Sequence, residues 1–214
     1  MDIQVVAEQK IRKLALSFAE QLRRQIDMRV KIMQEDETSH YLIYKVLGIA
    51  TEEGRLIDEY QNKGRFLYKY AGSFLEEVAK LCFQLKHPDS KPCFIDNTLG
   101  KKPKRFGIDC LLDKFAIEIK WRDATTDGDH ITKEHTRIQN IAAAGFTPIR
   151  VMFYYPNREQ AQRIQETIKT IYAGVGGVYY SGDEAWTFVA EQTGINLLGI
   201  LEKIAAENEP KFQS

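Results

Sequence analysis

Cysteines and long hydrophobic runs are scarce in this sequence. Its three cysteines, Cys82, Cys93 and Cys110, form no Cys-x-x-Cys spacing, and an odd number cannot all pair. We therefore expect reduced thiols and no zinc site. No apolar run approaches the roughly 20 residues of a membrane-spanning helix, and residues 1–10 lack the pattern of a secretory signal peptide. These absences predict a soluble, cytoplasmic protein.

The chain also has no excess of either charge. Lys plus Arg and Asp plus Glu both number 30, so the formal net charge is zero. Many nucleic-acid-binding proteins are basic overall, but a local basic surface is enough to attract a phosphate backbone. The balance therefore argues only mildly against such a partner. The glycine-rich stretch 174–177 lacks the following Lys-Ser/Thr pair, which argues against a phosphate-binding loop.

Residues 1–65 are predicted to form a helical N-terminal subdomain. Their apolar residues recur at spacings of three and four, the period of a helix that buries one face. Basic residues crowd the other face of the first helix, where a solvated surface is a simpler interpretation than a phosphate contact. The predicted elements are helices over 3–34, 40–49 and 55–60, with turns at Gly54 and Gly64.

The remaining chain alternates helices and strands. This order predicts an α/β fold in which helices flank a mixed central sheet. We expect residues 66–180 to form the core and the C-terminal helices of 181–214 to pack on it. The predicted elements are a helix over 72–85, a loop over 87–97, hairpin strands over 107–112 and 115–121, a helix over 131–144, a strand over 146–155, a helix over 157–172 that Asn157 caps, a strand over 178–180, and helices over 183–192 and 196–207.

The hairpin, GIDCLLDKFAIEIKW, combines an apolar face with an ionisable one. Ala116, Glu118 and Lys120 alternate with apolar residues and so share one face of the second strand. If Asp113 and Lys114 form the reversal, counting back places Asp109 opposite Glu118. Like charges directly opposite destabilise a sheet. The pair therefore indicates either a protonated carboxyl group or a cation between the two carboxylates.

A magnesium site is the interpretation that we favour for this pair. Hard divalent ions prefer carboxylate and water oxygens, and Lys120 is placed to orient or deprotonate a water, or to hold a phosphate oxygen. The alternative is an exposed hairpin whose charges simply meet water. However, residues 115–119 are almost continuously apolar, which is typical of a strand covered by other elements.

Two polar segments flank the hairpin, the basic run 101–105 before it and the loop 122–130 after it. Such segments are usually solvated, but beside a metal site they are candidates to contact phosphates and base edges. Asp127, Asp129 and His130 lack a complete calcium-loop pattern, so a second metal cluster is disfavoured. The candidate DNA-binding residues are Lys101, Lys102, Lys104, Arg105, Arg122, Asp127, Asp129, His130, Lys133, His135 and Arg137.

The spacing of these residues resembles that of a known nuclease motif. Asp109, eight further residues and then Glu118-Ile119-Lys120 look like the active-site motif of the PD-(D/E)XK nuclease superfamily, with Ile108 where the name-giving proline would stand. The run EIKWRDATTDGDHITKEHTRI, residues 118–138, is similar to type II restriction endonucleases of the ApaLI type. The resemblance implies a restriction-endonuclease-like core over residues 66–180 and a dimerisation or DNA-contacting role for residues 1–65.

The resemblance also implies an activity, a cofactor and partners. The activity is Mg²⁺-dependent, sequence-specific hydrolysis of double-stranded DNA at a short palindrome, and Mn²⁺ is expected to substitute. Asp109, Glu118 and the Ile119 carbonyl would hold the metal, and Lys120 would position or activate the attacking water. A homodimer is expected, with a cognate DNA methyltransferase as a genetic partner. The alternatives are a structure-selective or repair nuclease of the junction-resolvase type and a non-catalytic DNA-binding module.

Nucleases of this superfamily often carry a further glutamate on the helix before the hairpin. Two adjacent residues qualify here, Glu76 and Glu77. A helical wheel places Glu77 at the border of the apolar stripe and so favours it, whereas the Gly-x-x-x-Glu spacing from Gly72 favours Glu76. We expect Glu77, with Glu76 as the alternative.

Overall fold

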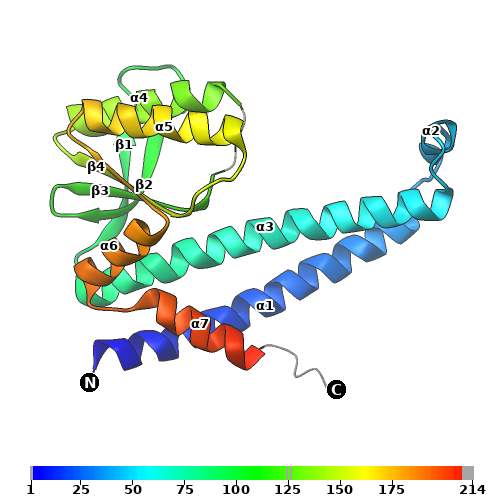
Figure 1. The fold of residues 1–214 in the computed structure, drawn as a ribbon, viewed down its shortest axis with the longest axis horizontal. Coiled ribbons are helices and arrows are strands. Elements are labelled where there is room, and N and C mark those ends of the chain that lie inside the picture. Colours follow the sequence, from blue (N-terminus) through cyan, green and yellow to red (C-terminus); the bar gives the residue numbers. More distant parts are fainter. Residues whose placement is uncertain (1, 124, 126, 209–214) are drawn as a thin grey trace. The chain divides into compact units, whose positions relative to one another are not determined.

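The computed structural model describes residues 2–123, 125 and 127–208, which form helices α1 to α7 and strands β1 to β5 (Figure 1). The chain divides into two compact units. One is Lys13–Phe74, and the other combines Met1–Arg12 with Leu75–Ser214. This division falls later than the expected boundary at residue 65, which lies inside a helix. Of the predicted C-terminal segment, residues 209–214 lie outside the described part.

The first unit consists of parts of α1 (Ile3–Glu35) and α3 (Thr51–Lys86) with the short α2 (Tyr41–Val46) between them. The Phe18 ring on α1 meets Phe74 on α3 edge-on, with 5.6 Å between centroids. Further along, Arg29 Nε donates to Asn62 Oδ1 at 3.2 Å. These contacts join α1 to α3 along this unit and confirm its predicted helical character.

The predicted turns at Gly54 and Gly64 are wrong, because both glycines lie inside the continuous helix α3. At Gly54 a Cβ would come within 2.6 Å of the Tyr44 ring, so glycine lets α2 pack closely there. At Gly64 a Cβ would meet no atom within 4 Å. A glycine inside a helix weakens it without ending it. Helix α3 therefore remains continuous through both glycines.

The second unit contains a five-stranded mixed sheet in the order β1-β2-β3-β4-β5. Pairing is antiparallel from β1 to β3 and parallel from β3 to β5, which confirms the predicted mixed sheet. The strands are β1 (Lys91–Asp96), β2 (Arg105–Leu112), β3 (Phe115–Arg122), β4 (Thr147–Tyr154) and β5 (Val178–Ser181).

Strand β1 corrects the loop expected over residues 87–97. Pro92 in this segment lacks a backbone N–H group and so argues against a central strand. However, β1 lies at the edge of the sheet, and only Ile95 is buried within it. Proline is tolerated at an edge, because the strand has a partner on one side only.

Helices cover both faces of the sheet. Figure 1 shows α4 (Asp129–Ala143) and α5 (Glu159–Gly174) over one face and α6 (Asp183–Thr193) against the other. On the first face, Met152 and Tyr179 of the sheet share a buried cluster with Ile138 of α4 and with Ile164, Ile168 and Tyr172 of α5. On the opposite face, the ring centroids of Trp186 on α6 and Phe153 on β4 lie 4.3 Å apart.

The last helix of the described chain is α7 (Leu197–Asn208), which follows α6 closely.

Arg158, rather than the expected Asn157, occupies the N-cap position of α5, and no side chain caps α5. None of the helices in the described part of the chain is long and apolar enough to cross a membrane.

Candidate active site

The β2–β3 hairpin has the predicted reversal at Asp113 and Lys114. Leu112 pairs with Phe115, Leu111 with Ala116, and Cys110 with Ile117. On its other edge, β2 pairs with β1. Cys93 and Lys91 of β1 are two residues apart, but their partners Ile108 and Leu111 on β2 are three apart. An extra residue in one strand is a β-bulge, and bulges often re-aim a side chain next to an active site.

Asp109 lies in this bulge, and its carboxylate turns toward β3. Its Oδ2 accepts a hydrogen bond from the backbone N–H of Ile119 at 2.9 Å. The Asp109 and Glu118 carboxyl groups also interact with each other. The hairpin therefore brings the two predicted carboxylates together, although Asp109 Oδ2 accepts from a backbone N–H group of β3.

The two carboxyl groups differ in charge state. Burial, followed by the negative charge of Glu118, raises the pKa of Asp109 to about 7. Burial also opposes ionisation of Glu118, but the positive charges of Arg137 and Lys120 outweigh it and lower the pKa of Glu118 to about 2. One carboxylate is thus firmly ionised, and the other lies close to protonation near neutral pH.

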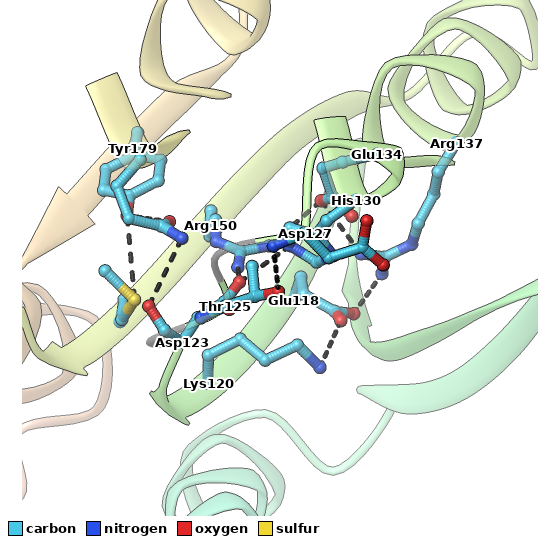
Figure 2. Close-up of polar contacts among 12 residues, drawn as sticks. Glu118, Lys120, Asp123, Thr125, Asp127, His130, Glu134, Arg137, Arg150 and Tyr179 are labelled. Carbon is cyan, nitrogen blue, oxygen red and sulfur yellow. Dashed lines mark hydrogen bonds and ion pairs between the residues drawn. The ribbon is translucent and has the colours of Figure 1, made fainter. Parts of the chain in front are cut away.

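Lys120 extends from the same face of β3 as Glu118. Its Nζ lies 2.6 Å from Glu118 Oε1 (Figure 2). Burial lowers the pKa of the Lys120 ammonium, but the carboxylates of Glu118, Asp109 and Glu76 more than compensate, so its pKa is raised overall. The Lys120 side chain retains about a third of its exposure, 32%. A partly exposed lysine side chain here can still reach a phosphate or a water molecule.

Arg137 was expected to contact DNA, but the structure places it in the interior. It is only 7% exposed, and its guanidinium donates to Glu118 Oε2 on the side away from Lys120 (Figure 2). Its Nη2 also donates to the Gly107 carbonyl at 3.1 Å. A guanidinium enclosed in this way is badly placed for a phosphate or a base edge. The expectation that Arg137 contacts DNA is therefore corrected, and Arg137 is assigned to the interior.

A buried chain of ion pairs continues from Arg137 into the core. Arg137 Nη1 and Arg150 Nη1 both donate to Glu134 Oε1, at 3.3 Å and 3.1 Å. Arg150, which is fully buried, also donates to Asp123 Oδ2 at 2.6 Å. The same oxygen lies 2.8 Å from Nε2 of His130. Figure 2 shows this chain running from Glu118 to the loop that follows β3.

Sequence reasoning missed Glu134 and Arg150, although each left a signal. Glu134 and Arg137 stand in register with Ile138 and Ile141, at the spacing of one helix face. Ile138 and Ile141 are buried, so the charged pair on their face is buried too. Arg150 interrupts an apolar strand, TPIRVMFY. A charge inside a buried strand needs a partner of opposite sign, and Glu134 and Asp123 provide it.

The two candidate glutamates of α3 lie in different surroundings. Glu77 is exposed and pairs with Lys80 at the next helical turn. Glu76 is partly buried, and burial raises the pKa of its carboxyl group. The charges of Lys120 and Glu118 both act on Glu76. These surroundings favour Glu76 as the additional carboxylate.

The remaining candidates for DNA contact lie on the surface of the second unit. Residues 101–105 are exposed immediately before and at the start of β2, and Arg122 is exposed at the end of β3. His130 is partly buried against Asp123. Residues 124 and 126 of the loop lie outside the described part. The exposed candidates are Lys101, Lys102, Lys104, Arg105, Arg122, Asp127, Asp129, Lys133 and His135.

The described residues contain no group of three or more His, Cys, Asp or Glu side chains arranged to hold a metal ion. Asp109 and Glu118 offer two carboxylates, and the Ile119 carbonyl stands between Glu118 and Lys120 in the sequence. Oxygen donors of this kind suit Mg²⁺, which usually takes one or two carboxylates and keeps several waters. Burial, followed by the negative charge of Glu118, raises the pKa of Asp109, and a divalent ion beside the two carboxylates would offset that negative charge. The residues therefore fit a magnesium ion.

Neither a curated protein nor a solved structure matches the chain. The family model of ApaLI-like restriction endonucleases matches residues 1–206 of the 214. This match spans both structural units and confirms the resemblance in residues 118–138. The chain therefore belongs to the family of ApaLI-like restriction endonucleases.

Proposed function

We propose that this protein is a Mg²⁺-dependent type II endonuclease that hydrolyses phosphodiester bonds of double-stranded DNA at a short palindrome. The observation that carries the proposal is the pair of the partly buried Asp109 and the buried Glu118, with Lys120 Nζ at 2.6 Å from Glu118. The family match adds the substrate class. A nuclease of the junction-resolvase type would use a similar site but act on branched DNA.

Each residue of the site has a proposed role. Asp109, Glu118 and the Ile119 carbonyl would hold the metal, and Glu76 would add a carboxylate on the α3 side. When bound, Mg²⁺ supplies Lewis-acid stabilisation of the charge that develops on the phosphate and lowers the pKa of a coordinated water. Lys120 positions or activates the attacking water, because its ammonium contacts Glu118 and its side chain remains partly exposed.

The proposed substrate requires a second copy of the chain. The described part of each chain carries one such site, whereas a palindrome presents the same scissile bond on both strands. A two-fold symmetric dimer places one site at each bond. We propose that the helical unit Lys13–Phe74 forms the dimer interface or a DNA-contacting arm, and that the exposed residues of 101–105 and of the loop after β3 contact the DNA.

Digestion of phage DNA in Mg²⁺ tests the activity directly. We expect discrete fragments from the wild type, none after chelation with EDTA, and restored cleavage with Mn²⁺. Asp109→Ala and Lys120→Ala should each lower the cleavage rate by at least about 10²-fold, because each removes a group placed at the reacting phosphate. Fragments that persist in Asp109→Ala would reject the proposed site.

The same experiment separates the alternatives. An enzyme that cuts a four-way junction but leaves linear DNA intact would be a structure-selective nuclease. Retained DNA binding without cleavage in Mg²⁺ or Mn²⁺ would indicate a binding module. Sequencing the ends of discrete fragments would give the recognition site.

A further inference from the structure

We infer that Arg137 is a positioning residue for the active site, which fixes the Glu118 carboxylate beside Asp109 by holding one of its two oxygens. The inference rests on the proposed nuclease function and extends it to a residue of the interior. Arg137 stands 19 residues beyond Glu118 in the chain, on a different element, and belongs to no part of the acid-x-lysine motif.

Two cations bind the Glu118 carboxylate, one at each oxygen. Lys120 Nζ contacts Oε1, and the Arg137 guanidinium donates to Oε2, so the carboxylate is held from both ends (Figure 2). Lys120 remains partly exposed, whereas Arg137 is 7% exposed. The cation on Oε1 is thus available to a substrate, and the cation on Oε2 is part of the scaffold.

The guanidinium is itself held in place. Arg137 Nη2 also donates to the Gly107 carbonyl at 3.1 Å, which ties it to β2 beside Asp109. Its Nη1 donates to Glu134 Oε1, which also accepts from Arg150 Nη1 and from the Tyr172 hydroxyl, the latter at 2.9 Å. A planar guanidinium with several donors can bridge three acceptors in this way, and a lysine ammonium cannot reproduce the fork.

Loss of this bond would leave Glu118 poorly restrained. A buried carboxylate that loses a cation tends either to take up a proton or to move toward water. Both changes reduce what Glu118 can offer a metal ion. Residues that orient metal-binding carboxylates typically contribute about 10- to 100-fold to metal affinity or activity.

Mn²⁺ binding without DNA, followed by electron paramagnetic resonance, tests the inference independently of cleavage. Arg137→Met should weaken Mn²⁺ binding about 10- to 100-fold, and Arg137→Lys should fall between it and the wild type. In steady-state cleavage, both variants should lower kcat and leave the KM for DNA unchanged within about twofold, because Arg137 touches no substrate.

Tyr172→Phe is the matched control. It removes one hydrogen bond to Glu134 from the same buried network but leaves the Arg137–Glu118 contact in place. It should lower the Tm yet bind Mn²⁺ like the wild type. Mn²⁺ binding by Arg137→Met that equals that of Tyr172→Phe, or exceeds that of the wild type, would overturn the inference.

Arg137→Lys decides by the same criterion if Arg137→Met does not fold, since it retains the buried positive charge. Binding by Arg137→Lys that equals that of Tyr172→Phe would then overturn the inference. A wild type that neither binds Mn²⁺ nor cleaves DNA would instead reject the proposed function itself.

Discussion

At the scale of single residues, the site is organised by how charge is shared among neighbours. Glu118 interacts with two cations, Lys120 and Arg137, whereas Asp109 accepts a hydrogen bond from the backbone N–H group of Ile119. The two cations hold Glu118 ionised, whereas burial, followed by the negative charge of Glu118, raises the pKa of Asp109 to about 7 despite the hydrogen bond from Ile119. Two carboxylates in one site thus acquire different properties from their surroundings, which is common where acids act together.

The adjacent glutamates of α3 provide a matched test at this scale. Glu76→Gln should lower the single-turnover cleavage rate by about tenfold or more, because the Glu76 carboxylate interacts with Lys120 and Glu118. Glu77→Gln should remain within about twofold of the wild type, because Glu77 is exposed and pairs with Lys80. The reverse order of effects would assign the additional carboxylate to Glu77.

At the scale of elements, helix α3 contributes to both compact units. Its first part belongs to the helical unit, and from Leu75 onward it belongs to the unit that contains the sheet and Glu76. Gly64 lies inside this helix without positive φ and with open space where a Cβ would be. Gly48, between α2 and α3, has a φ of +84°. The two glycines therefore have opposite conformational needs.

Substitution of these glycines tests whether α3 is continuous in solution. Gly64→Ala should raise the free energy of unfolding by about 0.5–1 kcal/mol, because alanine loses less backbone entropy in a helix. Gly48→Ala should lower it by about 1 kcal/mol or more, because an L side chain is strained at positive φ. Urea denaturation measures both. Destabilisation by Gly64→Ala similar to that by Gly48→Ala would indicate a turn at residue 64.

At the scale of the whole molecule, the helical unit exposes a row of large apolar side chains on α3. Leu56, Ile57, Tyr60 and Leu67 lie along one side of α3 at helical spacing, and all four are exposed. Tyr60 alone is 67% exposed. Contiguous apolar patches on a soluble protein commonly mark an interaction surface. This stripe is the part of the helical unit that we expect to meet a second copy in the proposed dimer.

A charge in the stripe tests this assembly. Tyr60→Glu should shift the protein from dimer to monomer in sedimentation velocity, because the new carboxylate would be desolvated in an apolar interface. It should also slow cleavage of the second strand of a duplex. Lys69→Glu is the control, since it places the same side chain on the opposite side of α3 and should remain dimeric. A wild type that is monomeric with and without DNA would reject the proposed dimer.

Much of this molecule could be predicted from the sequence. Helical spacing predicted α1, hairpin alternation predicted β2 and β3, and the order of elements predicted a mixed sheet between helices. Asp109, Glu118 and Lys120 were predicted as site residues because they are charged side chains that share one face of an otherwise apolar hairpin, and charged groups covered by other elements need a partner or a ligand. Strand β1 and the continuity of α3 escaped prediction, because Pro92, Gly54 and Gly64 are local signals that packing overrides.

The sequence by itself determined which residue types stand at the site, since period-two alternation fixes which side chains share a face of β3. The tertiary structure decided how they are used. Asp109 accepts a hydrogen bond from the Ile119 N–H group, and the packing of α4 on the sheet places Arg137 against Glu118. Those contacts join residues distant in the chain, and local periodicity contains no information about which distant charges will meet.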